Sequence, residues 1–243
     1  MIARIGITLV LLFALAGGAV AQWADYPAGP IDSKTLRSQS KAEILYERGD
    51  FKRALFIYEK ELAGTGDKYA QYMTGYMYLM GQGAPADPVL ASAWYRLAAE
   101  RNAPEFIAVR DQLLGTMNDG QRAQSDRLYI GLRKELSDVV LIMNLMLADL
   151  KRLDSRTTGS RLGGSSSPVT IIDPQTGIPI SAAHYESRIR DIVQTRLDFV
   201  TARLDIDELD ADLSGEQIDS LWERINDYVS VVNDDGDVFV GTR

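Results

Sequence analysis

The feature that most constrains the fold of this chain is a pattern that occurs twice. The matching pairs are Asp50 with Asp87, Ala54 with Ala91, and Tyr58 with Tyr95, each 37 residues apart. A helix-like segment precedes each copy, at residues 40–48 and 67–80, so the repeating unit is a helix, a turn and a helix. A single unit of this kind cannot bury its own apolar face, whereas stacked units bury it between them. The spacing therefore predicts a short α/α solenoid of about two helix-turn-helix repeats.

The residues between the helices of the second copy are typical of helix ends. Gly81 follows an apolar run, as a glycine does when it ends a helix in the left-handed conformation. Asp87 can cap the next helix, and Pro88 falls in its first turn, where a missing N–H is not needed. Asn102 closes that helix because asparagine tolerates the left-handed conformation. We therefore interpret residues 81–102 as structural rather than as a binding site.

Residues 70–102 resemble the Sel-one-like repeat, a relative of the tetratricopeptide repeat. The residues that carry the resemblance are Ala70, Gly75, Tyr78, Gly81, Gly83, Asp87, Ala91, Trp94, Tyr95, Ala98 and Ala99. The chain departs from the family pattern at Thr74, Ala84 and Asn102, where leucine, valine and glycine are usual. Residues 42–69 are similar to a degenerate, more tetratricopeptide-like unit. The resemblance implies that these positions shape the repeat, and that the solenoid binds proteins and has no chemistry of its own.

A set of tyrosines in the helix before this turn is the candidate binding surface. Tyr69, Tyr72 and Tyr76 are three and four residues apart, so they share one helix face. If that face is concave, it offers a peptide-binding surface, because tyrosine provides a large contact area at low entropic cost. The alternative is that Tyr72 and Tyr76 fill the core between repeats. For Trp94 and Tyr95, packing in the core is the favoured interpretation.

The first 21 residues have the layout of a secretory signal peptide. Arg4 precedes an apolar stretch, and Ala19, Val20 and Ala21 form a small-x-small cleavage site before Gln22. The apolar stretch is too short for a good membrane span. The chain has no cysteine, so neither a lipoprotein anchor nor a disulfide can form. We expect cleavage between Ala21 and Gln22, and a periplasmic or secreted protein of a Gram-negative bacterium with no stable membrane anchor.

The charge of the chain is unevenly distributed. The formal net charge is −8, and residues 183–243 hold 6 basic and 15 acidic side chains. A nucleic-acid-binding protein presents a basic face, and the sequence indicates none, so no nucleic-acid partner is expected. The acidic region either attracts cations and basic partners or forms a well-solvated helical surface.

A long amphipathic helix is predicted after the solenoid, which spans residues 22–117 and ends in a short capping helix at 105–117. Asn118 can cap the long helix, which spans residues 118–154. Its apolar residues recur at spacings of three and four; they are Leu128, Leu132, Leu136, Val139, Met143, Met146, Leu150 and Leu153. Such a stripe is typical of a core helix or of a coiled-coil seam, so a homodimer through residues 128–153 is the alternative to core packing.

The rest of the chain is predicted as a flexible linker at 155–168 and a C-terminal region at 169–243. Strands at 169–172 and 178–181 would form a β-hairpin, with Gly177 at positive φ in its turn. Helices are expected at 185–204 and 215–229, and residues 229–241 suggest a second hairpin. The predicted fold is therefore mainly α: a short solenoid followed by long coiled-coil-like helices with one or two small β-hairpins.

Few residues point to chemistry. Asp210, Asp212 and Ser214 match the opening of a calcium loop, in which alternate oxygens surround a hard cation. The glutamate expected at the end of that loop is replaced by Leu221, and helix capping explains the same residues. The single histidine, His184, has no cysteine or second histidine near it in the sequence and is interpreted as a surface or capping residue. No nucleophile or phosphate-binding loop is recognised, so we predict neither an enzyme nor a cofactor.

These observations predict a non-enzymatic protein–protein interaction or scaffold module of the bacterial cell envelope. It would bind a peptide or partner protein through the groove of the helical repeat. The alternative is a structural or regulatory envelope protein that responds to calcium through its acidic C-terminal segment.

Overall fold

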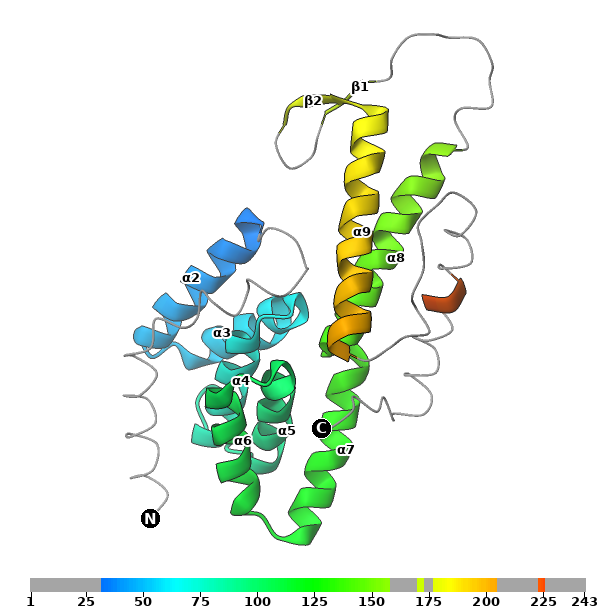
Figure 1. Cartoon of the computed structure of the whole chain (residues 1–243). Coiled ribbons are helices and arrows are strands. Elements are labelled where there is room, and N and C mark those ends of the chain that lie inside the picture. Colours follow the sequence, from blue (N-terminus) through cyan, green and yellow to red (C-terminus); the bar gives the residue numbers. More distant parts are fainter. Residues whose placement is uncertain (1–31, 158–169, 173–176, 205–222, 226–243) are drawn as a thin grey trace.

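The computed structural model describes residues 32–157, 170–172, 177–204 and 223–225, which are mostly helical (Figure 1). The first elements are α2 (Ser33–Glu47), α3 (Phe51–Phe56), the π-helical η2 (Ile57–Leu62), the 3-10 turn η3 (Ala63–Thr65), α4 (Lys68–Met80), α5 (Pro88–Ala98) and the 3-10 turn η4 (Ala99–Arg101). The later elements are α6 (Pro104–Gly115), α7 (Asp119–Leu136), α8 (Asp138–Thr157), β1 (Thr170–Ile172), β2 (Pro179–Ser181) and α9 (Ala182–Leu204). This content confirms the predicted mainly α class. Within these ranges no helix combines the length and the apolar character needed to cross a membrane.

The helices of the first part of the chain stack on one another (Figure 1). α2 packs on α3 and η2, α4 packs on η2 and α5, and α5 packs on both α6 and α7. The sequence predicted about two repeat units followed by a separate long helix. The structure differs because Leu132 and Leu136 of α7 pack against Trp94 and Leu97 of α5. The first half of the predicted long helix therefore packs on the repeat stack.

The helix predicted over 118–154 is interrupted at Ser137. α7 begins with a capping box, in which Asn118 Oδ1 accepts from the Gln121 N–H and Gln121 Oε1 accepts from the Asn118 N–H. Ser137 has an extended backbone, with φ −66° and ψ 151°, and its hydroxyl accepts from the Val140 N–H at 3.4 Å. Its side chain thus competes for the backbone of the next turn and starts a new helix. The structure has two helices, α7 and α8, where one was predicted.

The apolar stripe of α8 is covered by α9 within the same chain. The buried residues of this two-helix core are Val139, Ile142, Met143, Met146, Leu150, Ile189, Val193, Leu197, Val200 and Ile225. The two helices lie side by side over most of their length (Figure 1). Core packing is therefore the alternative that agrees with the environment of these residues, and a homodimer through 128–153 stays a prediction.

A β-hairpin connects α8 to α9, as the sequence predicted. β1 pairs antiparallel with β2, with Ile171 opposite Ile180, and Gly177 before β2 has a φ of +69°. α9 begins at Ala182, earlier than the predicted start at residue 185. The Ser181 hydroxyl accepts from the N–H of His184 at 3.2 Å, so this serine caps the helix. The His184 side chain is exposed in the first turn of α9.

Several predicted segments fall outside the described residues. They are the signal peptide at 1–21, the linker from residue 158 onward, the acidic segment around 210–214 and the second hairpin. Residues 155–157, assigned to the linker, are the last residues of α8. Within the helix predicted at 215–229, residues 223–225 are described and helical, and Ile225 packs in the core between α8 and α9.

Candidate functional site

The predicted tyrosine face lies inside the repeat stack. Tyr72 is 4% exposed, and its ring centroid lies 5.4 Å from that of Tyr95 and 5.6 Å from that of Phe106. Tyr76 is 9% exposed and stacks on Tyr72. Burial raises the pKa of Tyr72 above its ordinary value because the phenolate would be poorly hydrated there. Of the two alternatives for Tyr72 and Tyr76, packing in the core agrees with these surroundings.

Tyr69 is the least buried of the three predicted residues. Its ring lies 6.4 Å from those of Tyr58 and Tyr72, and its side chain is half-buried. Burial raises the pKa of Tyr69 to about 12. Contact between Tyr69 and a partner stays a prediction, but a continuous three-tyrosine docking surface is not present, because Tyr72 and Tyr76 are covered.

Two repeat glycines allow close approach between helices. A β-carbon on Gly83 would lie 2.5 Å from the carbonyl oxygen of Phe51, and the backbone there has a φ of +86°. A β-carbon on Gly75 would lie 2.8 Å from the ring of Tyr95. Both glycines therefore occupy positions at which any larger residue would push a neighbouring element away.

The other repeat residues fix the turn and the helix that follows it. Gly81 ends α4 with a φ of +67°, and Asp87 Oδ1 accepts from the Leu90 N–H at 2.9 Å at the start of α5. Trp94 packs in a buried cluster with Leu97. The small residues Ala91 and Ala98 are fully buried, which lets α5 approach its neighbours closely. None of these residues forms a site that is open to a ligand.

The open surface of the repeat region lies on α2, the first described helix. Asp32 caps this helix by accepting from the Thr35 N–H at 2.7 Å. The buried side of α2 carries Ser38, Ala42 and Leu45, at spacings of four and three. That side faces α3 and η2, so most of the remaining helix surface is left toward solvent.

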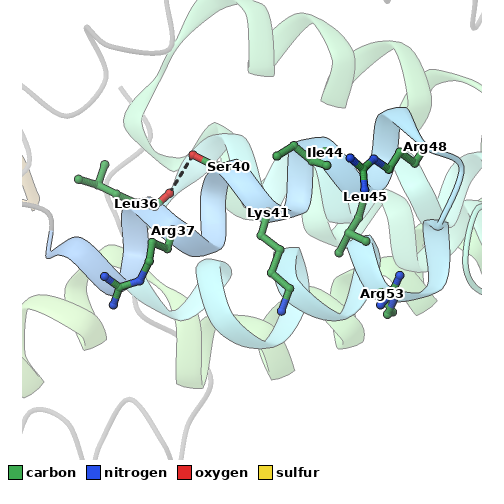
Figure 2. A pocket seen from close by; sticks show the side chains of 8 residues that line it. All are labelled: Leu36, Arg37, Ser40, Lys41, Ile44, Leu45, Arg48 and Arg53. Carbon is green, nitrogen blue, oxygen red and sulfur yellow. Dashed lines mark hydrogen bonds between the residues drawn. The ribbon is translucent and has the colours of Figure 1, made fainter.

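An open groove runs along this remaining surface (Figure 2). The residues that line it, called the α2 groove below, are Leu36, Arg37, Ser40, Lys41, Ile44, Leu45, Arg48 and Arg53. Six belong to α2, Arg48 is the C-cap of that helix, and Arg53 comes from α3. Figure 2 shows Lys41 and Leu45 extending from α2 toward the helix that carries Arg53. The lining of the groove thus combines apolar and basic side chains.

The basic residues of the α2 groove are mostly unpaired. Arg53 donates to Asp50 at 2.6 Å, and this hydrogen bond holds the pKa of the Asp50 carboxyl below its ordinary range. Within the described part of the chain, no carboxylate forms an ion pair with Arg37, Lys41 or Arg48. These three cations therefore present uncompensated positive charge, which attracts anionic groups.

Exposed apolar side chains accompany these cations. Leu36 is 49% exposed and Ile44 is 46% exposed. Phe56, one turn after Arg53 on α3, is 59% exposed. The terminal unit of a solenoid normally carries a polar outer face, which keeps the protein soluble. The first pair of this solenoid instead keeps apolar residues on its surface.

This groove was not predicted from the sequence. Over residues 22–182 the 19 basic and 19 acidic side chains balance, so no basic face was evident. Residues 33–56 alone contain six basic and three acidic side chains. One sequence pattern could have indicated the groove: Arg37, Lys41, Ile44 and Arg48 recur at spacings of four, three and four, which places them on one side of a helix.

A buried ionic network, also missed, joins the repeat stack to α8. Lys68 Nζ lies 3.0 Å from Glu100 Oε2 and 3.2 Å from Asp138 Oδ1. Arg101 donates to both oxygens of Asp138, at 2.8 and 2.9 Å. Arg133 Nε lies 3.9 Å from Glu100 Oε1. These contacts join α4, η4, α7 and α8, so the network positions the helices relative to one another.

The two carboxyls of this network respond differently to their surroundings. Burial raises the pKa of Glu100, and the charge of Lys68 only partly offsets it. Burial acts in the same direction on Asp138, but the charge of Lys68 and the hydrogen bonds from Arg101 outweigh it and lower the pKa. Asp138 is therefore the carboxylate that the network holds in its ionised form.

The predicted calcium residues Asp210, Asp212 and Ser214 lie outside the described residues, as do Ala21 and Gln22 at the predicted cleavage site. Their roles stay predictions. In the ranges that the structure describes, no group of three or more histidine, cysteine or acidic residues could hold a metal ion.

Comparison with known proteins identifies one segment of the chain. Residues 68–102, which contain α4, α5 and η4, match the Sel1 repeat family. No curated protein and no solved structure matches the chain. Sel1 repeats are in general protein–protein interaction modules and are typically non-catalytic. The matched segment therefore supports a protein partner in general terms.

Proposed function

We propose that this protein is a non-enzymatic scaffold of the bacterial cell envelope that holds a partner protein or peptide on its helical-repeat region. The Sel1 repeat at 68–102 is the observation that carries the proposal. Its helices form a well-packed core with the helices on either side, so the region provides a rigid surface. Rigid surfaces bind with a smaller entropic cost than surfaces that must order on binding.

The envelope location is supported by the sequence of residues 1–21, which resembles a cleavable signal peptide. Mass spectrometry of the protein from a periplasmic fraction tests it. We expect a mature chain that begins at Gln22. Recovery of chains that still begin at Met1 in the cytoplasmic fraction would contradict this location.

The binding role is tested by crosslinking in intact cells. An affinity-tagged full chain is treated with an amine-reactive crosslinker, and the proteins attached to it are identified by mass spectrometry. An unrelated exported protein with the same tag is the control. We expect a partner that is enriched with this chain and not with the control. If only copies of the chain itself are recovered at all crosslinker concentrations, the scaffold proposal fails.

A further inference from the structure

We infer that the α2 groove binds an acidic amphipathic helix of a partner protein. This inference rests on the proposed function, since it assumes a protein partner, and it adds the chemistry of that partner and the surface that receives it. Arg37 and Lys41 of α2 and Arg48 at its C-cap form no ion pair with the described residues, and they lie with the exposed side chains of Leu36 and Ile44. Apolar residues on the incoming helix would cover Leu36 and Ile44, and glutamates or aspartates beside them would pair with the basic side chains of the groove.

Charge complementarity selects an acidic occupant. The excess of negative charge lies in residues 183–243, with 15 acidic and 6 basic side chains, so a basic partner would be attracted to that region rather than to the α2 groove. An acidic partner is attracted only where the surface is locally basic, as it is over residues 33–56. The basic side chains of the groove therefore orient the bound helix and make binding selective for acidic partners.

The shape and the composition of the groove favour a helix over a membrane surface. Its lining comes from two helices, since Arg53 of α3 lies beside the α2 residues (Figure 2). A groove between helices that carries exposed apolar side chains suits the face of an incoming amphipathic helix. A helix that inserts into lipid needs a broad exposed apolar face, whereas Ala42 and Leu45 of α2 are turned into the protein.

The acidic C-terminal segment of the same chain is a less suitable occupant. α9 ends at Leu204, and Ile225 packs in the core between α8 and α9. The described residues on either side of this segment therefore belong to α9 or pack against α8 and α9. α2 begins the described part of the repeat stack, whereas α8 follows α7.

The test uses the full mature chain and a display library of amphipathic helical peptides of about five turns. Leucines are fixed on the apolar face, and the flanking positions vary among glutamate, glutamine and lysine. We expect glutamate-rich peptides to be enriched. Enrichment of lysine-rich or glutamine-rich peptides, or no enrichment, would overturn the inference.

The selected peptide is then measured by fluorescence anisotropy against two variants with the same change in net charge. Lys41→Glu/Arg48→Glu reverses charge at the groove and is expected to weaken binding roughly tenfold. Arg127→Glu/Lys151→Glu reverses two exposed charges on α7 and α8 and is expected to change the affinity by less than about twofold. Leu36→Ser/Ile44→Ser removes the two exposed apolar side chains of the groove and is also expected to weaken binding of the peptide. All four side chains of the two charge variants are exposed, and circular dichroism checks that the variants are folded. Equal loss in both charge variants would overturn the inference.

Two further measurements identify the other occupants. In the first, a photoreactive residue is placed at position 44. A crosslink to residues 205–222 of the same chain would show that the chain's own segment, and not a partner helix, occupies the groove. In the second, the protein is sedimented with vesicles containing phosphatidylglycerol. Saturable binding that is lost in Lys41→Glu/Arg48→Glu would show that the groove binds a membrane surface and not a partner helix. If the groove variants keep the partner found by crosslinking in cells, the scaffold proposal stands and only this inference fails.

Discussion

Lys68 Nζ lies 3.2 Å from Asp138 Oδ1, so the first residue of α4 and the first residue of α8 share a buried ion pair. The side chains are 1% and 5% exposed. Glu100 and Arg101, near the end of the Sel1 repeat, complete the network. The orientation of α8 relative to the repeat stack therefore depends on charges contributed by the repeat itself.

Lys68→Met removes the ammonium group and keeps much of the length of the side chain. Glu100 and Asp138 would then be buried with fewer positive partners. We expect the free energy of unfolding, measured with urea, to fall by about 3–5 kcal/mol. Lys151→Met, on the exposed side of α8, is the matched control and should change it by less than about 0.5 kcal/mol. Equal effects would show that the buried network does not stabilise the fold.

Asp138→Asn tests the pH dependence of the same network. The pKa of Asp138 is lowered in the folded protein, so its ionised form stabilises the fold above the ordinary carboxyl pKa of about 4. This contribution is lost as the pH falls through the lower, folded-state pKa. We expect the variant to be less stable than the wild type at pH 7, with the difference shrinking as the pH falls below about 4. Asp198→Asn, at an exposed carboxyl of α9, is the control and should change the free energy of unfolding at pH 7 by less than about 0.5 kcal/mol.

Gly83→Ala should destabilise the repeat. The new β-carbon would lie 2.5 Å from the Phe51 carbonyl oxygen, in a backbone conformation with a φ of +86°. We expect a loss of about 1–3 kcal/mol in the free energy of unfolding. Gly131→Ala is the control, because that glycine lies in α7 and its β-carbon would meet nothing within 4 Å. Since alanine favours helix, this second variant should gain up to about 1 kcal/mol. A loss of the same size in both variants would contradict this account.

Local patterns were sufficient to predict much of the fold. The paired aspartates, alanines and tyrosines indicated stacked helix pairs, and Gly177 marked the turn of the hairpin. The break at Ser137 was missed because the apolar stripe continues on both sides of it. Serine caps a helix only where its backbone is extended, and the sequence does not show that conformation. The network around Lys68 could not be predicted, since it joins residues that are far apart in sequence. The α2 groove was missed because charge was counted over residues 22–182 together, which hides the excess of basic side chains at residues 33–56.

Tyr72→Ala distinguishes the two alternatives for the tyrosine face. If Tyr72 fills the core, as its contacts with Tyr95 and Phe106 indicate, its removal leaves a cavity. We expect a loss of about 3–5 kcal/mol in the free energy of unfolding. Phe56→Ala removes an exposed aromatic ring of α3 and should cost less than about 0.5 kcal/mol. A stable Tyr72→Ala protein that loses its partner would instead support a docking role for this residue.

The packing of α8 on α9 predicts that the protein is a monomer. Met143 and Met146, in the middle of the stripe that could have formed a dimer seam, are fully buried beside Val193 and Leu197 of the same chain. A second chain could reach these side chains only if α9 were displaced, which would expose its own apolar residues. We therefore expect multi-angle light scattering to give the mass of one chain at all concentrations. Asn144→Arg, on the exposed side of α8, should leave that mass unchanged. A mass of two chains for the wild type would contradict the prediction. If Asn144→Arg then reduced the mass to that of one chain, the dimer contact would lie on the exposed side of α8 rather than on the buried stripe.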